Sequence, residues 1–204
     1  MTPDSDKQPT VFIVDDDPAI RFAMQALMDS VNLDHEIFAS GDEFLENVDD
    51  HRAGCLVLDI RMPGLGGLEL QEELIKHGST LPIIFITGHG DVPMAVEAMQ
   101  KGAVDFIQKP FRDQDLLDRI REALKTDQER REEQQKHAEV ADRLSRLTNR
   151  EREVFDLVVT GKPNKVIAYE LGVSQRTVEI HRARVMEKMQ ARSLADLVKM
   201  HMTA

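Results

Sequence analysis

The sequence predicts an α/β domain with a doubly wound, five-stranded parallel sheet, followed by a helical linker and an all-α domain of four helices that includes a helix-turn-helix. Two observations lead to this prediction. Short apolar runs alternate with helical periodicity in the first part of the chain. Charge is also uneven, because residues 143–204 carry 12 Lys and Arg against 7 Asp and Glu, whereas the rest carries 14 against 30. We therefore place the domains at 1–124 and 143–204, with the linker at 125–142.

Five apolar runs have the length and composition of buried strands. They lie at Thr10–Val14, about His35–Phe38, Cys55–Leu58, Pro82–Thr87 and Asp105–Gln108. Helical patterns separate these runs, which is the order expected of a parallel sheet covered on both faces.

The helices between the strands are predicted from their periodicity and their ends. Asp17, directly before Pro18, is expected to cap the first helix. Ser40 and Glu43 form a capping-box pattern at the second, and Asp91-Val-Pro93 opens the fourth. The apolar face of the first helix consists of Ile20, Ala23, Met24, Leu27, Met28 and Val31. The third and fifth helices are expected at Gly67 to about His77 and from near Arg112.

Polar side chains stand where four of the strands end. Asp15 and Asp16 follow the first strand, Asp59 the third, Thr87 closes the fourth, and Lys109 follows the fifth. Because the carboxyl ends of parallel strands meet at one edge of the sheet, we expect these side chains to converge. Carboxylates at such range cannot all stay ionised unaided, and a divalent cation with oxygen ligands, above all Mg²⁺, would hold them together.

An aspartate beside Mg²⁺ is arranged to accept a phosphoryl group as an aspartyl phosphate. The Thr87 hydroxyl could hydrogen-bond one phosphoryl oxygen, and the Lys109 ammonium could neutralise another. The alternative is that these acids only cap helices or face solvent. For Asp59 the combination of an acid pair, a hydroxyl and an ammonium, each at the end of its own strand, argues against that alternative.

These motifs resemble the receiver domain of two-component response regulators, which has a flavodoxin-like fold. The matching stretches are Val-Asp15-Asp16-Asp17, Leu-Asp59-Ile-Arg-Met-Pro63-Gly64, Ile-Thr87-Gly-His-Gly and Phe106-Ile-Gln-Lys109-Pro110-Phe111. The run from Thr87 to Met99 resembles the FixJ/StyR/TodT-like subgroup.

The resemblance implies a role for each residue of the site. Asp59 is then the phosphoacceptor, and Asp16, Asp59 and the backbone carbonyl of Arg61 bind Mg²⁺, with Asp15 contributing through water. By the same resemblance, Thr87 and Lys109 bind the phosphoryl group, and Phe106 is the aromatic switch that turns inward when Thr87 moves.

The linker contains no apolar residue from Thr126 to His137. Its composition favours helix, so it is either the fifth helix running on with a solvated face or a helix that forms in one state only. After it, Val140, Leu144 and Leu147 form a short apolar stripe that could add to a dimer contact but is too short to predict a coiled coil.

The last part of the chain predicts four short helices. Thr148 to Glu151 is a capping box for the first, which Gly161 ends, and Pro163 stands where the second begins. Gly172-Val-Ser174 predicts a tight turn before a third helix, from Gln175 to about Gln190, and Ser193-Leu-Ala-Asp196 caps a last one. The inner stripe of the third helix is Val178, Val185 and Met189.

Two helices joined by a Gly turn, the second rich in Arg, indicate a helix-turn-helix that places its second helix in the major groove. Leu147-Thr-Asn-Arg-Glu-Arg-Glu-Val, Asn164-Lys165-Val-Ile-Ala168, Leu171-Gly-Val-Ser and Arg176-Thr-Val-Glu-Ile-His-Arg182 resemble the LuxR/GerE-type DNA-binding domain. We expect phosphate contacts from Lys165, Arg176, Thr177 and Arg184, base contacts from Glu179, Ile180, His181 and Ala183, and further DNA contacts from Asn164 and Ser174.

Two positions depart from the commoner LuxR/GerE pattern. Pro163 stands where a hydroxyl residue is usual, and Glu179 stands where many relatives carry Lys. An acid in the groove could accept a hydrogen bond from cytosine N4 but repels phosphate. Because the FixJ subgroup also has an acid there, this departure bears on base preference rather than on binding.

The expected protein is a cytoplasmic transcription factor. One cysteine, no apolar run of about 20 residues, and a beginning, MTPDSDKQPT, without a signal pattern argue against secretion or a membrane partner. The resemblance implies that a sensor histidine kinase phosphorylates Asp59, and that the protein then forms a homodimer, binds double-stranded promoter DNA and activates transcription with RNA polymerase. The cofactor is Mg²⁺.

Two alternatives remain beside this hypothesis. A Mg²⁺-dependent phosphohydrolase could use the same nucleophile, but it would usually carry a general acid two residues later, where this chain has Arg61. The protein is therefore not expected to be an enzyme beyond its own phosphoryl transfer and dephosphorylation. A DNA-binding protein independent of phosphorylation is the other alternative, and the complete acidic pocket argues against it.

Overall fold

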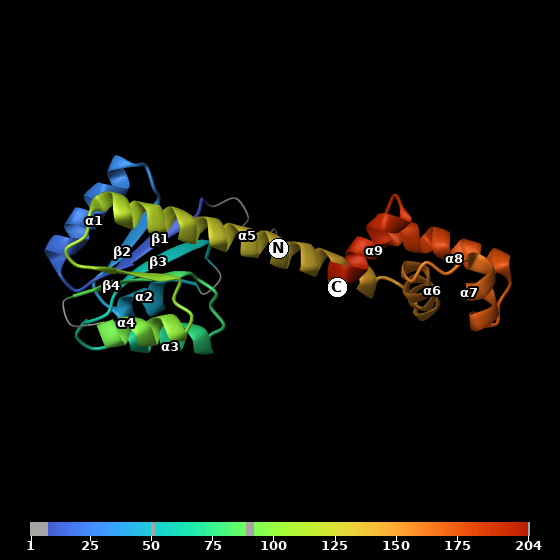
Figure 1. Cartoon of the computed structure of the whole chain (residues 1–204), viewed down its shortest axis with the longest axis horizontal. Coiled ribbons are helices and arrows are strands. Elements are labelled where there is room, and N and C mark those ends of the chain that lie inside the picture. The colour runs from blue at the N-terminus through green and yellow to red at the C-terminus, as the bar shows by residue number, and fades with distance from the viewer. Residues whose placement is uncertain (1–7, 50–51, 89–91, 204) are drawn as a thin grey trace. The chain divides into compact units, whose positions relative to one another are not determined.

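The computed structural model describes residues 8–49, 52–88 and 92–203. It separates into two compact units, unit 1 (residues 1–130) and unit 2 (residues 131–204). Figure 1 shows the sheet in unit 1 and the short helices of unit 2. Within the described residues, none of the helices has the length and apolarity needed to cross a membrane.

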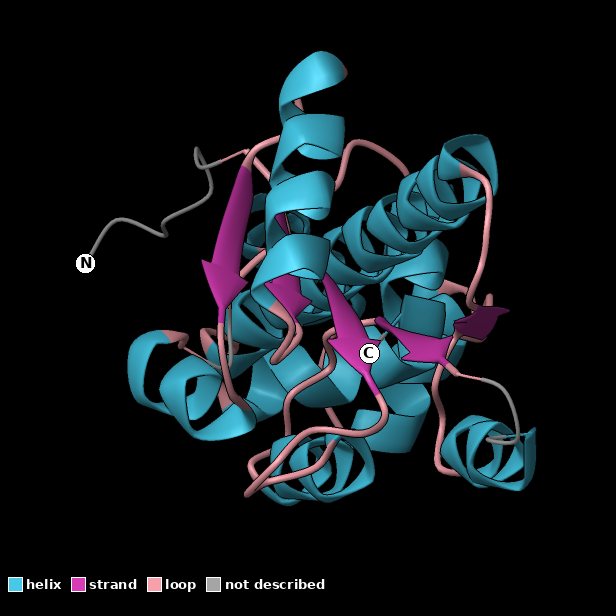
Figure 2. Cartoon of the chain, turned by 90° about the vertical axis from the view of Figure 1, so that its left-hand side faces the viewer, coloured by secondary structure: helices cyan, strands magenta, loops and turns pink. Residues whose placement is uncertain are grey.

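Unit 1 contains a five-stranded sheet in the order β2-β1-β3-β4-β5, in which every neighbouring pair is parallel. This confirms the predicted doubly wound sheet. In Figure 2 the strands run through the middle of the unit, with helices on either side. The strands are β1 (Thr10–Val14), β2 (His35–Phe38), β3 (Gly54–Asp59), β4 (Ile83–Thr87) and β5 (Asp105–Gln108).

Five helices cover the two faces of this sheet (Figure 1). They are α1 (Pro18–Ser30), α2 (Gly41–Asn47), α3 (Gly67–Lys76), α4 (Val92–Gln100) and α5 (Asp113–Ser145). One apolar core joins the sheet to α2, α3 and α4, and a second joins it to α1 and to the first part of α5. Because β3 is central and buried along its whole length, the two cores fix its position from both sides.

The helix starts follow most of the end signals. The Asp17 carboxylate accepts a hydrogen bond from the Ala19 N–H at 2.8 Å, which confirms it as the cap of α1. The Ser40 hydroxyl accepts from the Glu43 N–H at 3.1 Å, whereas the Glu43 carboxylate accepts from Ala39 rather than Ser40. Asp91 lies outside the described residues.

The predicted apolar face of α1 is wrong at one position. Met24 and Met28 are buried, and Ile20, Leu27 and Val31 are half-buried, but Ala23 is exposed. The small Ala23 side chain lies at the edge of the stripe, where it does not reach the sheet.

Gly67 brings α3 close to the end of β3. A Cβ atom at this position would lie 2.4 Å from the Asp59 carbonyl oxygen and 3.1 Å from the Phe85 ring. Only glycine therefore allows the start of α3 to pack directly against the end of the strand. The Gly67 N–H also donates to the Ile60 carbonyl at 3.0 Å, which fixes the loop after Asp59.

Unit 2 contains the four predicted short helices: α6 (Asn149–Val159), α7 (Asn164–Leu171), α8 (Gln175–Lys188) and α9 (Leu194–Thr203). The capping box of Thr148 and Glu151 is confirmed. Gly172 adopts a left-handed conformation (φ 66°) that ends α7, and Ser174 caps α8. The predicted inner stripe of α8, Val178, Val185 and Met189, is fully buried.

The end of α5 packs into unit 2. Val140 and Leu144 are 7% and 9% exposed and belong to the same core as α6, α7 and α8. Val140 and Leu144 therefore stabilise the fold of their own unit, and a contribution of this stripe to a dimer contact stays a prediction.

The predicted linker is helical throughout, since α5 runs without interruption from Asp113 to Ser145. This confirms the interpretation that the fifth helix runs on beyond the sheet. The accompanying interpretation of a solvated face is wrong at Asp127, which is 1% exposed. An unbroken run of exposed residues occupies only 132–139 of the predicted linker.

Candidate functional site

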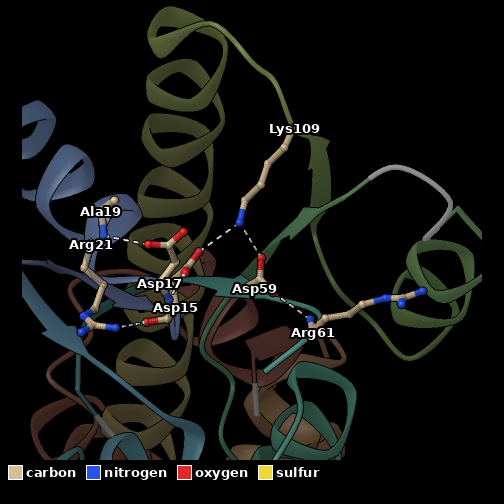
Figure 3. A network of polar contacts seen from close by, with 7 residues as sticks. All are labelled: Asp15, Asp17, Ala19, Arg21, Asp59, Arg61 and Lys109. Atoms are coloured by element: carbon tan, nitrogen blue, oxygen red, sulfur yellow. Dashed lines mark hydrogen bonds and ion pairs between the residues drawn. The ribbon is translucent and has the colours of Figure 1, made fainter. Parts of the chain in front are cut away.

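The predicted site residues of unit 1 lie at the carboxyl edge of the sheet. Asp15 directly follows β1, Asp59 is the last residue of β3, Thr87 the last of β4, and Lys109 directly follows β5. Parallel pairing in register brings these strand ends to one edge, because Val14 pairs with Leu58 and Thr87 with Gln108. Figure 3 shows Asp15, Asp59 and Lys109 converging there.

The Lys109 ammonium lies between two buried carboxylates (Figure 3). Its Nζ atom donates to Asp59 Oδ1 at 2.7 Å and to Asp15 Oδ2 at 3.1 Å. Asp15 and Asp59 are only 2% and 8% exposed. Two carboxylates that lie this close together and are shielded from water require a cationic partner, and in this structure Lys109 is that partner.

The electrostatics of the cluster follow from this burial. Burial raises the pKa of Asp15, although hydrogen bonds from the Asp17 N–H and Lys109 oppose the shift. Burial acts to lower the pKa of Lys109, but its hydrogen bonds and attraction to Asp59 and Asp15 outweigh burial and raise it. The lysine therefore remains protonated at neutral pH and supplies a fixed positive charge.

Backbone groups hold the remaining carboxylate oxygens. The Arg61 N–H donates to Asp59 Oδ2 at 2.8 Å, and the Asp17 N–H donates to Asp15 Oδ1 at 2.9 Å. Arg21, which the sequence did not indicate as a site residue, donates from Nη1 to the Asp15 carbonyl at 2.7 Å and joins α1 to the site. An arginine in the first turns of a helix usually faces solvent, so nothing in the sequence pointed to this contact.

The other predicted residues lie around this cluster rather than within it. Asp16 is exposed, and the Arg61 side chain points away from Lys109 (Figure 3). Thr87 is buried, and its carbonyl accepts from the Lys109 N–H at 2.7 Å. Phe106 is half-buried against the core that joins the sheet to α2, α3 and α4.

The site is open on the side of Lys109. A hollow of about 510 Å³ lies beside it, lined by Ile20, Gly88, Lys109, Pro110 and Phe111. The Lys109 ammonium is therefore accessible from solvent on this side.

The donor set suits a hard divalent cation. The described residues contain no group of three or more His, Cys, Asp or Glu side chains arranged to hold a metal. Two buried carboxylates nevertheless already face one cation, the ammonium, and carboxylate and carbonyl oxygens are the ligands that Mg²⁺ prefers. The chemistry of the donors therefore fits Mg²⁺.

The predicted DNA-binding residues of unit 2 gather on α8 and the start of α7. Arg176, Glu179, Ile180, Ala183 and Arg184 are exposed on α8, opposite its buried stripe. An exposed helix face that carries arginines is the surface a helix-turn-helix presents to the major groove.

Three of the predicted contact residues also hold this surface together. The Ser174 and Thr177 hydroxyls are 2.7 Å apart, and Ser174 Oγ accepts from the Thr177 N–H at 3.1 Å. Asn164 Oδ1 accepts from Arg182 Nη1 at 3.0 Å, which joins α7 to α8. Lys165 is exposed beside Asn164.

His181 is half-buried on α8. Its Nδ1 atom is buried and has no hydrogen-bond partner within the described part of the chain. The predicted contact with a base can therefore involve only the other atoms of the imidazole ring.

The last turn of α8 is held by a lysine whose partners lie far away in the sequence. Lys188 Nζ donates to Glu151 Oε2 at 2.6 Å and to the Arg146 carbonyl at 3.1 Å. Its place in the last turn of the helix was visible in the sequence, but its partners 37 and 42 residues away were not.

Two family models match the chain, and their boundaries agree with these two sites. Residues 11–121 match the response regulator receiver domain, and residues 145–201 match the luxR family of bacterial regulatory proteins. The first match contains Asp15, Asp59, Thr87 and Lys109, and the second contains all of α8.

Similar proteins carry both domains across nearly the whole length. Nodulation protein W of Bradyrhizobium diazoefficiens is 49% identical, with 95% of this chain and 85% of that protein covered. The response regulator protein TodT of Pseudomonas putida is 44% identical (96% and 86% covered), and the transcriptional regulatory protein FixJ of Azorhizobium caulinodans is 44% identical (95% and 92%).

Solved structures show the same fold. The response regulator StyR superposes with a TM-score of 0.90 at 44% identity, covering 97% of this chain and 100% of that one. Full-length FixJ from B. japonicum gives a TM-score of 0.61 at 40% identity, with 97% of each chain covered. The chain therefore belongs to the DNA-binding two-component response regulators of the FixJ/TodT type, in which a receiver domain precedes a LuxR-type helix-turn-helix domain.

Proposed function

We propose that phosphorylation of Asp59 by a partner histidine kinase controls DNA binding by this response regulator. The observation that carries the proposal is the Lys109 ammonium, 2.7 Å from Asp59 and 3.1 Å from Asp15 at the carboxyl edge of the sheet. This ammonium can neutralise a negatively charged group that binds beside the two buried carboxylates.

The transfer step uses the Asp59 carboxylate as nucleophile. One of its oxygens forms a bond to phosphorus while the bond from phosphorus to the histidine nitrogen of the donor breaks, and the imidazole leaves with the electron pair. Lys109, already within hydrogen-bond distance, then neutralises a phosphoryl oxygen. The Thr87 hydroxyl is proposed to donate to a second oxygen.

The acids around Asp59 are proposed to hold Mg²⁺. Asp16, Asp59 and the Arg61 carbonyl would ligate it, with Asp15 contributing through water. When bound, the ion supplies positive charge that stabilises the transferring phosphoryl group.

The switch is proposed to work through charge. A phosphoryl group adds about −1.5 to −2 charges at neutral pH and strong acceptor oxygens. Thr87 moves to meet those oxygens, and Phe106, half-buried in the resting structure, turns inward into the space that Thr87 leaves.

The output is proposed to be a homodimer on promoter DNA. Two α8 helices would read half-sites about 34 Å apart, one helical turn of DNA. Contacts with DNA phosphates are proposed for Lys165, Arg176, Thr177 and Arg184, with further DNA contacts from Asn164 and Ser174. Contacts with base edges are proposed for Glu179, Ile180, His181 and Ala183.

We propose that the receiver domain spans residues 1–124, the linker 125–142 and the DNA-binding domain 143–204.

The dimer is proposed to activate transcription in the cytoplasm through RNA polymerase. Relatives named as transcriptional regulatory proteins support this output rather than a metabolic enzyme. Beyond its own phosphoryl transfer and dephosphorylation, we propose no enzymatic activity.

The test is the affinity for operator DNA, with and without beryllofluoride and Mg²⁺, of the wild type and Asp59→Asn. The wild type should bind more tightly with beryllofluoride and shift to a dimer in solution, whereas Asp59→Asn should do neither. Asp118→Asn, which removes an exposed acid on α5, is the matched control and should respond like the wild type. A full response in Asp59→Asn would exclude Asp59 as the trigger.

A further inference from the structure

Asp127 is a buried acid in a stretch that otherwise has the composition of a solvated helix. It is 1% exposed, while Thr126, Gln128 and Glu129 beside it are exposed. Burial of a carboxylate without partners is costly, so this position must provide strong compensating contacts.

One of those contacts comes from β3, the strand that carries Asp59, and another comes from α5 itself. Asp127 Oδ2 accepts from the Gly54 N–H at 3.0 Å, across 73 residues of sequence. Its Oδ1 accepts from Arg130 Nη2 at 2.5 Å. Gly54 is the first residue of β3, and Asp59 is the last.

Gly54 is shaped for this contact. Its φ is +149°, and a Cβ atom there would lie 1.9 Å from the Thr10 carbonyl oxygen. The strand start is therefore pressed against β1 in a conformation that only glycine adopts without a clash. Arg52 fixes the same edge, because its guanidinium donates to Glu36 at 2.9 Å and to the Thr10 hydroxyl at 3.2 Å.

β3 is thus held at both ends by side chains from later in the chain. Lys109 holds Asp59 at the carboxyl end, and Asp127 holds Gly54 at the amino end. The strand is buried along its length and would extend about 17 Å if regular. A close-packed, buried strand of this kind has low compressibility and can transmit strain between its ends.

Apolar packing of α5 against the sheet ends before Asp127. The last fully buried apolar residue of α5 in unit 1 is Ala123, and Leu124 is half-buried. Residues 132–139 are exposed and have no apolar side chain except Ala138. Because a short helical segment is only marginally stable on its own, a buried polar contact at Asp127 helps to hold the part of α5 that follows Ala123.

We propose that Asp127 is a positioning residue that fastens the interdomain helix to the phosphoacceptor strand, so that the state of Asp59 reaches the linker through β3. This inference rests on the proposed control by phosphorylation. It assigns the connection to one hydrogen bond, between Asp127 Oδ2 and the Gly54 N–H, supported by the Arg130 ion pair.

Three variants of the full-length protein test the proposal. Asp127→Ala removes the contacts with Gly54 and Arg130, and Asp127→Asn keeps an acceptor for Gly54 while losing the charge that faces Arg130. Glu129→Ala removes an exposed acid from the same turn of α5 and is the matched control. The main measurement is the ratio of operator affinities with and without beryllofluoride and Mg²⁺.

We expect Asp127→Ala to become phosphorylated at Asp59 by acetyl phosphate like the wild type, as measured by intact mass. Its affinity ratio should nevertheless fall toward one. Amide exchange at Gly54 should become about ten-fold faster, since a hydrogen bond to a charged group is lost. Asp127→Asn should lie between Asp127→Ala and the wild type, and Glu129→Ala should match the wild type in every measurement.

If Asp127→Ala keeps the wild-type ratio of operator affinities with and without beryllofluoride and Mg²⁺, the proposal is wrong, whatever the rate of amide exchange at Gly54. Should that variant fail to fold, the ratio in Asp127→Asn decides by the same criterion. A wild type that does not respond to beryllofluoride would instead refute the proposed function. Gly54 exchange in the Asp127 variants would then still report whether the contact exists.

Discussion

Lys188, in the last turn of α8, reaches the buried carboxylate of Glu151 at the start of α6, with 2.6 Å between Nζ and Oε2. The same oxygen accepts from the Thr148 N–H at 2.9 Å. Glu151 is 2% exposed, and its carboxylate joins two partners, the N–H at the start of α6 and the ammonium at the end of α8. This ion pair therefore helps to hold the end of α8 against α6.

This ion pair predicts acid sensitivity of unit 2. The hydrogen bond from Lys188, followed by that from the Thr148 N–H, lowers the pKa of Glu151 to about 2 from an ordinary 4.5. A lowered folded-state pKa stabilises the fold above the unfolded-state pKa, and this stabilisation is lost as pH falls from about 4.5 to about 2. Thermal unfolding of unit 2 followed between these pH values should show the loss.

The variant Glu151→Gln should remove that pH dependence and lower stability at pH 7 by roughly 1–3 kcal/mol, because a charge-assisted hydrogen bond is lost. Glu153→Gln, which alters an exposed pair with Arg150, is the control and should change stability little. Equal acid sensitivity in Glu151→Gln and the wild type would contradict the assignment.

Lys109→Met should slow phosphorylation of Asp59 by about ten- to a hundred-fold, because the fixed charge beside the transferring group is gone. Intact mass spectrometry after mixing with acetyl phosphate measures the rate. Lys125→Met, which changes a lysine that is 74% exposed on α5, should react like the wild type. A Lys109→Met protein with the wild-type rate would show that the ammonium serves structure alone.

Gly67→Ala should destabilise unit 1 by about 2–4 kcal/mol, since its Cβ would lie 2.4 Å from the Asp59 carbonyl oxygen. The neighbouring Gly66→Ala is a close control, because its Cβ would crowd the movable end of Glu69 at 2.5 Å, whereas the Ile60 carbonyl oxygen lies at an ordinary 3.7 Å. Urea unfolding of both variants measures the difference. If the two variants were equally stable, close packing of α3 on β3 would not be what requires glycine.

Arg184→Ala should weaken binding to specific and unrelated duplexes alike and reduce the slope of log affinity against log salt by about 0.9, the value for one phosphate contact. Arg184 is exposed on α8, opposite the buried stripe. Arg150→Ala, on the exposed side of α6, should leave the slope unchanged. Fluorescence anisotropy at several salt concentrations distinguishes these results, and an unchanged slope in Arg184→Ala would remove this contact.

Glu179→Gln should alter base preference rather than overall affinity. A carboxylate in the major groove can accept from cytosine N4 but repels phosphate, and a specific base contact contributes about 1–3 kcal/mol of discrimination. Selection of preferred sequences by both proteins measures this change. Identical preferences would place Glu179 away from the bases.

The sequence predicted those features whose cause is local or whose position is set by topology. Asp17 and Thr148 cap helices through neighbours a few residues away. Asp15, Asp59 and Lys109 meet because parallel strands end at one edge, which alternating strands and helices already imply. Both features follow from the pattern of polar and apolar residues and from the order of strands and helices along the chain.

Contacts between distant elements could not be predicted in the same way. The composition around Asp127 favours solvent, and its burial depends on a glycine amide 73 residues away. Val140 and Leu144 form a stripe that suits a dimer as well as a core, and their burial in the core of unit 2 depends on the position of α6, which the sequence does not give. The partners of Lys188 and Arg21 cannot be inferred from the spacing of residues in the sequence.

The exposed segment 132–139 has a consequence for how such regulators can be recombined. Everything upstream of it that stabilises the receiver, including Asp127, stays with the receiver, and Val140 and Leu144 stay with the helix-turn-helix core. A crossover between two such genes within these eight codons would join the receiver of one protein to the DNA-binding domain of the other without cutting through either apolar core. We expect chimaeras joined in this segment to fold more often than chimaeras joined at Asp127 or Val140.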